Sequence, residues 1–453
     1  MKIRRFLSVF LLAVLTVSLW ASPRASALEE PDIQCKAALL VDAHTGAVVY
    51  AKNEHQELYP ASLTKIMTCL LTLEAIDKGK LDMNQAVTAT ATALEGLPSD
   101  GSTAGIQAGE VMTVEHLLYC MMVVSANEAS QILAETISGS VAAFVGEMNA
   151  KAEALGCKNT HFVNPHGIHD SQHYTSAWDM YLIAREAMKH EQLMTICDTP
   201  TDVIPATNTS PARTLRTTNY LIGSWYTRGY LNGDAHGIKT GSTSQAGHCL
   251  VSTATRGTRS FISVVMGGDR TELENNEIRT YSFYDTNQLF NWAFDNFTYQ
   301  TLLREDDMVL DVAVSLSEAD HVVVHPRSDV EVLLPGDVSP ESMERDVTLK
   351  ADPAEAPIAA GDVLGTMTLS LDGVEYASVD LLALNDVEAS RSQIFLRDLK
   401  LFFGKPAVKA VIAVLAALAI LLAAWKLIFS RRRYRYGRSV GRSRRTGYRG
   451  RRR

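Results

Sequence analysis

Residues 59–72 of the 453-residue chain read YPASLTKIMTCLLT, and they begin a strongly apolar helical pattern. Pro60-Ala61-Ser62 precedes the pattern, and Lys78-Gly79-Lys80 ends it. Its apolar side chains recur at near-helical spacing, and they are Leu63, Ile66, Met67, Leu70, Leu71 and Ile76. So apolar a run predicts a helix buried in a protein core.

Ser62 and Lys65 lie at the start of this helix. Three residues are nearly one helical turn, so the two side chains are expected on the same face. A serine hydroxyl is a weak nucleophile until a base takes its proton, and a helix N-terminus favours a developing negative charge. The short pattern also fits an N-cap serine beside a surface lysine, so it needs support from elsewhere.

Two further motifs provide that support. Ser125-Ala126-Asn127 interrupts a helical pattern that begins at Thr113, and it offers a hydroxyl for proton relay and an amide for a substrate carbonyl. Lys239-Thr240-Gly241 lies at an expected strand, where lysine and threonine could bind a carboxylate and the glycine would let a ligand backbone approach. Ser-x-x-Lys, Ser-Asp-Asn and Lys-Thr-Gly in this order are the signature of class A β-lactamases and penicillin-binding proteins.

Strand-like runs lie at both ends of this helical region. Residues 38–51 are expected to form a β-hairpin, and residues 247–255 and 260–266 form a second pair of strands. Beyond about residue 300 the chain changes to short β-like runs punctuated by Gly and Pro. This change predicts a separate small β-domain.

The two ends of the chain indicate export and anchoring. Residues 1–27 combine basic residues, an apolar run and small residues before a cleavage site, which is typical of a signal peptide. Residues 407–429 are apolar on all sides and long enough to span a bilayer as a helix. Twelve arginines follow within residues 431–453, and the positive-inside rule places them in the cytoplasm.

Charge separates the body of the chain from its ends. Residues 28–404 hold all 51 carboxylates against 24 lysines and arginines, a formal charge near -27. Such an acidic body would repel phosphates, so we expect no nucleic-acid partner. Membrane topology accounts for the arginine-rich tail without one.

The sequence resembles the penicillin-binding D-alanyl-D-alanine carboxypeptidases, low-molecular-mass serine peptidases that trim bacterial cell-wall stem peptides. The likeness spans roughly residues 35–300, and the β-rich domain and membrane anchor behind them also fit the family. The stretches that carry it are YPASLTKIMT at 59–68, SANEA at 125–129, NTHFVNPHG at 159–167 and GIKTGST at 237–243. The spanning C-terminal helix departs from the amphipathic anchor frequent in the family.

The resemblance implies the role of each motif residue. Ser62 would form the acyl-enzyme, Lys65 would accept its proton, and Ser125 would relay a proton to the leaving amine. The residues implied in substrate binding are Asn127, Lys239, Thr240, Gly241 and Ser242, with backbone N–H groups of Ser62 and Ser242 as the oxyanion hole. Either Arg216 or Arg270 could assist Thr240 with the terminal carboxylate, and the sequence does not decide between them.

The resemblance also implies substrate and location. The substrate would be the peptidoglycan stem pentapeptide, β-lactam antibiotics would be covalent inhibitors, and no cofactor is expected. A catalytic domain outside the cytoplasm would be held to the cell membrane by a single C-terminal helix. The alternatives are a class A-like β-lactamase, which needs a second base that the sequence does not place, and a non-catalytic cell-wall binding protein.

These expectations combine into one architecture. The fold class is α/β, in the α+β sense, with helices packed on an antiparallel sheet, then a small all-β domain and one transmembrane helix. The expected segments are a signal peptide at 1–27, a peptidase domain at 28–300, a β-domain at 301–395, a membrane helix at 407–429 and a tail at 430–453.

Two other residue groups suggest no separate site. His166, His169, Asp170 and His173 lack the i, i+4 histidine spacing of a helical metal site, so we expect no metal there. The six cysteines form no Cys-x-x-Cys pair, and their disulfide state stays open.

Overall fold

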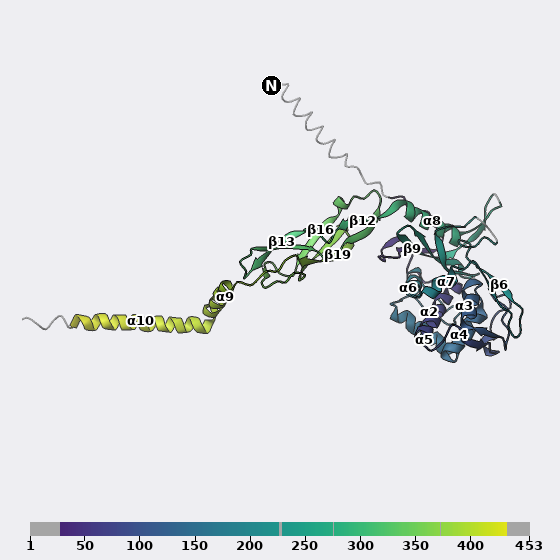
Figure 1. The fold of residues 1–453 in the computed structure, drawn as a ribbon, viewed down its shortest axis with the longest axis horizontal. Helices are drawn as coiled ribbons and strands as arrows, with labels where there is room; N and C mark the ends of the chain where they lie inside the picture. Colours follow the sequence, from purple (N-terminus) through teal and green to yellow (C-terminus); the bar gives the residue numbers. More distant parts are fainter. Residues whose placement is uncertain (1–27, 226–228, 275, 372, 433–453) are drawn as a thin grey trace, which may run out of the picture. The chain divides into compact units, whose positions relative to one another are not determined.

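The computed structural model describes residues 28–225, 229–274, 276–371 and 373–432. The predicted signal peptide lies outside these residues, as does the tail from residue 433 onward. The described chain forms two compact units, one of residues up to 302 together with 331–343, the other of residues 303–330 and those from 344 onward. Figure 1 labels their helices and strands.

A five-stranded antiparallel sheet is the centre of the first unit, with the strand order β2-β1-β9-β8-β7. Its strands are β1 (Ala37–Asp42), β2 (Val48–Lys52), β7 (Ala235–Thr243), β8 (Gly247–Arg256) and β9 (Arg259–Gly268). The N-terminal hairpin and the later strands were predicted. Their pairing, in which Leu39 of β1 lies opposite Val264 of β9, joins the two ends of the unit.

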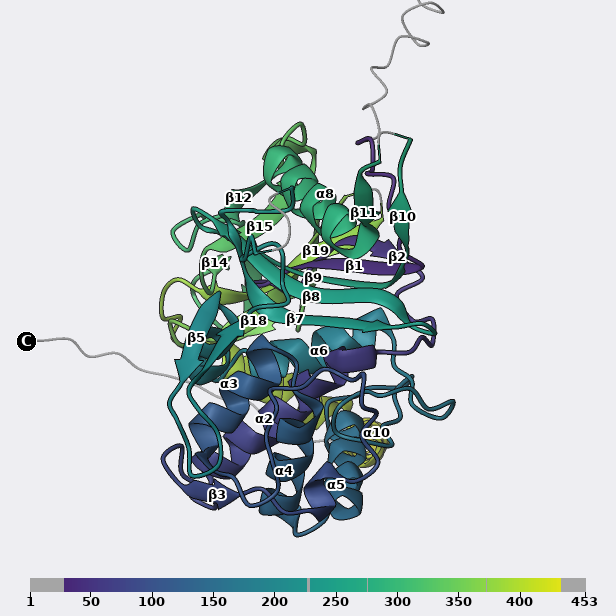
Figure 2. The same cartoon turned by 90° about the vertical axis from the view of Figure 1, so that its right-hand side faces the viewer.

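Both faces of this sheet are buried. Leu39 and Val41 pack into a core with the helical region, whereas Ala38 and Leu40 pack into a second core. Figure 2 shows α8 over one face and α2, α3, α4, α5 and α6 under the other. The alternation follows the two-residue period of a strand. It explains why the central strands are apolar along their whole length.

The helical face holds most helices of the unit. They are α2 (Thr64–Asp77), α3 (Val114–Val123), α4 (Asn127–Ser138), α5 (Val141–Ala154), α6 (Ala177–Ala187) and α7 (Glu191–Cys197), with a short 3-10 helix η1 (Ala61–Leu63) before α2. Helix α2 is buried along nearly its whole length, as its apolar sequence predicted. The opposite face is covered by α8 (Tyr281–Asn296), for which the sequence patterns gave no expectation.

Small two-stranded sheets border the unit. They are β3 (Ala86–Thr88) with β4 (Val111–Thr113), β5 (Thr201–Ile204) with β6 (Arg213–Arg216), β10 (Arg270–Glu272) with β11 (Ile278–Thr280), and β12 (Phe297–Leu303) with β15 (Val330–Pro335). Strand β15 thus pairs with β12 and joins the first unit, although it lies within the sequence range expected for the β-domain. The 300/301 boundary stays a prediction.

The second unit is built on a six-stranded sheet with the order β16-β18-β19-β14-β13-β17. Its strands are β13 (Leu310–Ser315), β14 (His321–Pro326), β16 (Glu344–Leu349), β17 (Ala354–Glu355), β18 (Val363–Leu371) and β19 (Val374–Ala383). Alternate side chains such as Val322 and Val324 are buried. The predicted all-β domain is confirmed as an element of the fold.

Two helices follow this sheet. Helix α9 (Arg391–Gly404) exposes several large apolar side chains, among them Phe395 and Leu401. Helix α10 (Pro406–Arg432) contains a 24-residue apolar stretch, Pro406–Phe429, none of which is buried within the protein. Length and composition make α10 a candidate membrane span.

Candidate active site

Ser62 lies in the 3-10 turn that precedes α2, so it is not the N-cap of that helix. The preceding Ala61 has a φ of +47°, a conformation that turns the chain sharply at this point. Lys65 Nζ lies 3.0 Å from Ser62 Oγ. The interpretation of an N-cap serine beside a surface lysine is therefore wrong, because Lys65 is completely buried.

Lys65 is held by two further acceptors. Its Nζ lies 2.8 Å from Asn127 Oδ1 and 2.7 Å from the backbone oxygen of His166. Burial, reinforced by the charge of Lys239, holds the Lys65 pKa well below its usual value, although Glu128 acts in the opposite direction. In its neutral form, an amine held in this way can donate to the two carbonyl oxygens and accept from the Ser62 hydroxyl with its lone pair. Such an arrangement would suit a general base.

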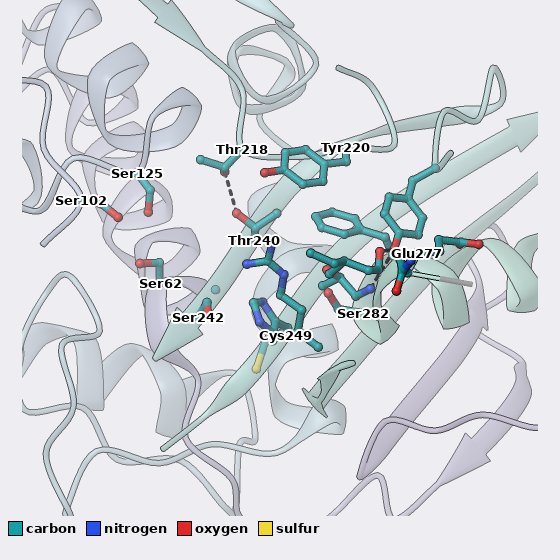
Figure 3. Close-up of a pocket in the computed structure, with 18 residues that line it drawn as sticks. Ser62, Ser102, Ser125, Thr218, Tyr220, Thr240, Ser242, Cys249, Glu277 and Ser282 are labelled. Carbon is teal, nitrogen blue, oxygen red and sulfur yellow. Dashed lines mark hydrogen bonds between the residues drawn. The ribbon is translucent and has the colours of Figure 1, made fainter. Parts of the chain in front are cut away.

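Ser125 occupies the connection between α3 and α4. Its φ of +65° is unusual for a residue with a side chain and aims the residue out of the helical path. Its Oγ is buried and has no hydrogen-bond partner within the described part of the chain, yet Ser125 lines the same cleft as Ser62. Figure 3 shows the two serines beside each other. A buried, unsatisfied hydroxyl at a cleft is suited to a substrate group.

Lys239 enters from strand β7, which is an edge strand of the sheet. It is buried, and its Nζ donates to the Thr240 carbonyl at 3.0 Å. Burial lowers the pKa of Lys239 to about 7, with Cys197 acting in the opposite direction. A buried lysine from a helix and a buried lysine from a strand thus lie close enough for the charge of Lys239 to lower the pKa of Lys65.

Gly241 allows β7 to pack against the turn that holds Ser62. A Cβ atom at this position would lie 2.7 Å from the backbone oxygen of Pro60 and 3.1 Å from the backbone nitrogen of Ser62. The first N–H groups of a helix lack intrahelical acceptors, so the Ser62 N–H is available beside the strand. The next residue, Ser242, belongs to the same edge strand and lines the cleft.

The cleft has a volume of about 580 Å³ and extends from Ser62 and Ser125 past Thr240. Thr240 Oγ1 lies 2.6 Å from Thr218 Oγ1, the interaction drawn in Figure 3. Of the two arginines considered for the carboxylate, Arg270 lines this cleft. Arg216 instead lies over the ring of Trp225, 4.9 Å from its centroid. The geometry therefore favours Arg270.

The structure adds Glu128 to the site, which the motifs did not single out. This buried carboxylate follows Asn127 directly, and its Oε1 accepts hydrogen bonds of 2.7 Å from Thr103 Oγ1 and from the Ala104 N–H. The adjacent Ser102 accepts from the Asn127 N–H through its carbonyl and lines the cleft. Sequence position beside Asn127 was the only available signal.

The histidines of residues 166–173 make separate contacts in the structure. His173 Nε2 lies 2.8 Å from Thr64 Oγ1, and His169 packs edge-on against Tyr59. Burial lowers the pKa of His166 to about 3, so its ring is neutral while its carbonyl holds Lys65. Among the described residues, no group of three or more potential ligands is placed to hold a metal ion. All six cysteines are free thiols.

Two sequence families match consecutive parts of the chain. Residues 24–270 match the D-alanyl-D-alanine carboxypeptidase family, and residues 297–389 match the C-terminal domain of penicillin-binding protein 5. The chain is 32% identical to a D-alanyl-D-alanine carboxypeptidase, DacF, of Bacillus subtilis, over 87% of this chain and 97% of the relative. It is 31% identical to DacA of Haemophilus influenzae, over 84% and 92%.

Solved structures of penicillin-binding proteins and related enzymes are similar to this chain in fold. The crystal structure of penicillin-binding protein 5 from Haemophilus influenzae matches with a TM-score of 0.64 and 31% identity, and the match covers 80% of this chain and all of that one. A structure of the Streptomyces K15 DD-transpeptidase matches with a TM-score of 0.52 and 28% identity, over 59% of this chain and all of that one.

Proposed function

The chain belongs to the D-alanyl-D-alanine carboxypeptidase family, and we propose that it removes the terminal D-alanine of the peptidoglycan stem pentapeptide through an acyl-enzyme on Ser62. It is a serine-type carboxypeptidase, and the alternatives of a β-lactamase and a non-catalytic binding protein are not favoured. The observation that carries the assignment of Ser62 is the 3.0 Å contact of its hydroxyl with a completely buried lysine.

Acylation follows from the positions of Ser62 and Lys65. Ser62 Oγ attacks the carbonyl of the penultimate D-alanine, and its proton passes to Lys65 Nζ. The backbone N–H groups of Ser62 and Ser242 lie on facing elements and bind the developing oxyanion. Each such donor contributes about 3 kcal/mol to transition-state stabilisation in comparable sites.

Departure of D-alanine requires a proton on its nitrogen. Ser125 passes its hydroxyl proton to this nitrogen and takes up the proton that Lys65 received from Ser62, so that Lys65 is neutral again. The nearby buried Lys239 supports this relay. The C–N bond then breaks and D-alanine leaves. In the second half of the reaction a water molecule attacks the ester, Lys65 again accepts a proton, and the Ser62 hydroxyl is restored.

The remaining residues hold the substrate. Asn127, fixed by its hydrogen bond with Lys65, contacts the substrate amide, while Thr240 and Arg270 bind the terminal carboxylate. Gly241 keeps β7 close to Ser62. Because β7 lies at the edge of the sheet, an extended peptide can pair with this strand. β-Lactam antibiotics present a reactive amide to the same serine and form a stable acyl-enzyme.

Helix α10 is the basis for the proposed location of the enzyme. We propose that it crosses the cell membrane once, with both folded units outside the cytoplasm and the arginines of residues 431–453 inside. Support comes from its apolar length and from the wall-bound substrate, which lies outside the membrane.

The assignment of Ser62 is tested by Ser62→Ala in the full chain, purified in detergent. Release of D-alanine from diacetyl-L-Lys-D-Ala-D-Ala falls to the background rate, while the thermal unfolding midpoint stays close to that of the wild type. A well-folded variant that still releases D-alanine at a tenth of the wild-type rate or more would reject Ser62 as the nucleophile.

A further inference from the structure

The residue before Ser62 has a backbone conformation that the chain itself does not favour. Ala61 has a φ of +47°, in the left-handed region that side chains with a Cβ atom rarely adopt. Such a conformation persists only where the surrounding structure holds it. Relaxation of this turn would move the Ser62 hydroxyl, which lies 3.0 Å from Lys65 Nζ. The contacts that hold Ala61 therefore bear on the reaction.

A chain of three hydrogen bonds ends at the Ala61 carbonyl. The Val163 N–H donates to His173 Nδ1 at 3.1 Å, and His173 Nε2 lies 2.8 Å from Thr64 Oγ1. The Thr64 hydroxyl donates to the Ala61 carbonyl oxygen at 2.8 Å. Thr64 and His173 are both buried. We call these three bonds the His173–Thr64 chain.

The two ends of the His173–Thr64 chain fix the direction of every bond in it. A backbone N–H can only donate, so His173 Nδ1 is the acceptor and the proton of the neutral ring is on Nε2. Burial lowers the pKa of His173 to about 4, so the ring is neutral near pH 7. Its Nε2–H donates to the Thr64 oxygen, because the Thr64 proton goes to a carbonyl that can only accept. Each group in the chain thus has one role.

The loop that carries this histidine also contacts the turn through its backbone. A Cβ atom at Gly167 would collide with the Ala61 carbonyl oxygen and lie 2.8 Å from Thr64 Oγ1. Only a glycine lets the loop pack so closely. The carbonyl of the neighbouring His166 accepts from Lys65 Nζ at 2.7 Å. One loop therefore contacts both the turn of the nucleophile and the expected base.

We infer that Thr64 and His173 are positioning residues for the acylation of Ser62. Their hydrogen bonds hold the turn at Ala61, and the turn holds the Ser62 hydroxyl within reach of Lys65. The described residues that line the cleft do not include Thr64 or His173, so the two side chains act through the turn and not on the substrate. This inference rests on the proposed function, in which Ser62 is the nucleophile.

The first test removes the Thr64 hydroxyl and keeps a side chain of similar size. Thr64→Val leaves the His173 Nε2–H without its acceptor and the Ala61 carbonyl without its side-chain donor, whereas Thr64→Ser keeps the hydroxyl. Thr72→Val is the matched control. Thr72 is also buried in α2, about 12 Å further along the helix, and its hydroxyl donates to the Thr68 carbonyl at 2.7 Å.

Stopped-flow acylation of the full chain in detergent by a fluorescent penicillin separates the dissociation constant of the first complex from the acylation rate constant. For Thr64→Val we expect the rate constant to fall at least fivefold while the dissociation constant changes less than twofold. Thr64→Ser and Thr72→Val should both keep the rate constant within about twofold of the wild type. A smaller fall in Thr64→Val, or an equal fall in Thr64→Ser or Thr72→Val, overturns the inference.

The amplitude of the reaction guards against a variant that folds poorly. The final amount of bound penicillin counts folded active sites, so unfolded protein lowers the amplitude and leaves the rate constant of the folded sites unchanged. A positioning role lowers the rate constant at full amplitude. Thr64→Val with reduced amplitude and the wild-type rate constant would show a structural role alone and overturn the inference.

The second test changes the other member of the pair. His173→Gln and His173→Met both remove the ring nitrogen that accepts from Val163, but only glutamine offers Thr64 a side-chain N–H donor. We expect the acylation rate constant of His173→Met to lie at least fivefold below that of His173→Gln. Equal rate constants for the two variants overturn the inference, because the bond to Thr64 would then have no effect on acylation.

Failure of the inference is distinguishable from failure of the proposed function. Acylation of the wild type, and its absence in Ser62→Ala, report the proposed function. If the wild type is acylated on Ser62 and Thr64→Val reacts with the same rate constant, the positioning role alone is rejected. If the wild type is not acylated on Ser62, the proposed mechanism itself is rejected.

Discussion

Lys65 shows how one residue acquires its function from the fold. Its position three residues after Ser62 was visible in the sequence, but a lysine in water is charged and cannot act as a base. Complete burial and the approach of Lys239 supply the change in pKa. The acceptors that hold its amine come from Asn127 and His166, which lie 62 and 101 residues away.

The rate of Ser62 acylation should therefore rise with pH. The rise should follow a group whose pKa lies below that of an ordinary lysine. The lowered Lys65 pKa leaves the amine neutral, and active, at pH values where a free lysine is protonated. Stopped-flow acylation by a fluorescent penicillin from pH 5 to 10 measures this profile. Lys65→Arg is expected to lower the rate at least about 100-fold, because guanidinium stays protonated. A flat profile would remove Lys65 from the role of base.

Gly241→Ala tests the close approach of β7 to Ser62. The new Cβ would collide with the Pro60 carbonyl, so we expect a loss of about 1–3 kcal/mol in unfolding free energy and a slower acylation of Ser62. Gly233→Ala is the matched control, since a Cβ there meets no atom within 4 Å. Unfolding in urea and acylation rates compare the two variants. Equal behaviour of both would contradict the packing argument.

Ser62, Lys65, Ser125 and Lys239 could be selected from the sequence because short motifs carry them. The structure places Lys65 in contact with Ser62, and Ser62 and Ser125 on one cleft, while the catalytic roles stay predictions. Glu128 could not be selected from the sequence, because its contacts depend on a loop 24 residues earlier that folds back onto it. A carboxylate in a helical pattern gives no sign of such a partner.

At the scale of elements, the loop at residues 102–106 and helix α4 act together. Glu128 binds the loop through Thr103 and Ala104, and the N-terminal residue of α4, Asn127, binds both Ser102 and Lys65. The loop forms part of the cleft wall because Ser102 lines it. Its position is thus coupled to the residues that hold the base.

Glu128→Gln is expected to shift the pH dependence of the Ser62 acylation rate to lower pH. The Glu128 charge raises the Lys65 pKa, so its removal lowers that pKa further and leaves the amine neutral at more acidic pH. The variant should also lose about 1–3 kcal/mol of stability, because a neutral amide replaces an acceptor of several hydrogen bonds. Glu153→Gln, at an exposed position of α5, is the control. An upward shift of the profile would refute this electrostatic coupling.

Element prediction worked best for periodic segments. The apolar pattern of α2 and the break between α3 and α4 were predicted, and so were the β-hairpin at residues 38–51 and the later strands. Helix α8 and the β10–β11 hairpin were not predicted, although α8 contributes to the second core and Arg270, Ile278 and Thr280 of the hairpin line the cleft. Strand β15 lies among the short β-like runs expected after residue 300, but its pairing with β12 depends on a chain reversal that local patterns do not encode.

For the molecule as a whole, the candidate active site and the candidate membrane helix lie in separate parts of the chain. The described site residues all lie in the first unit, whereas the apolar helix belongs to the C-terminal part. Residues 28–404 carry a large negative charge and α10 carries the apolar surface. We therefore expect the candidate anchor to be dispensable for the chemistry.

A chain that ends at Ser390, before α9 and α10, is expected to be soluble and to release D-alanine with kcat/KM within about twofold of the full chain. Removal of both helices eliminates the exposed apolar side chains that would contact lipid. Membrane fractionation and a D-alanine assay measure the two properties. Persistence of the truncated protein in washed membranes would show that another segment holds the enzyme there.

The proposed mechanism depends on Ser62 being the nucleophile that is acylated. Mass spectrometry of the full chain after penicillin treatment, followed by peptide mapping, identifies the acylated residue. We expect a single stable penicilloyl group on the peptide that contains Ser62, with none in Ser62→Ala. An adduct on another residue, no adduct, or rapid turnover of penicillin as in a β-lactamase would contradict it.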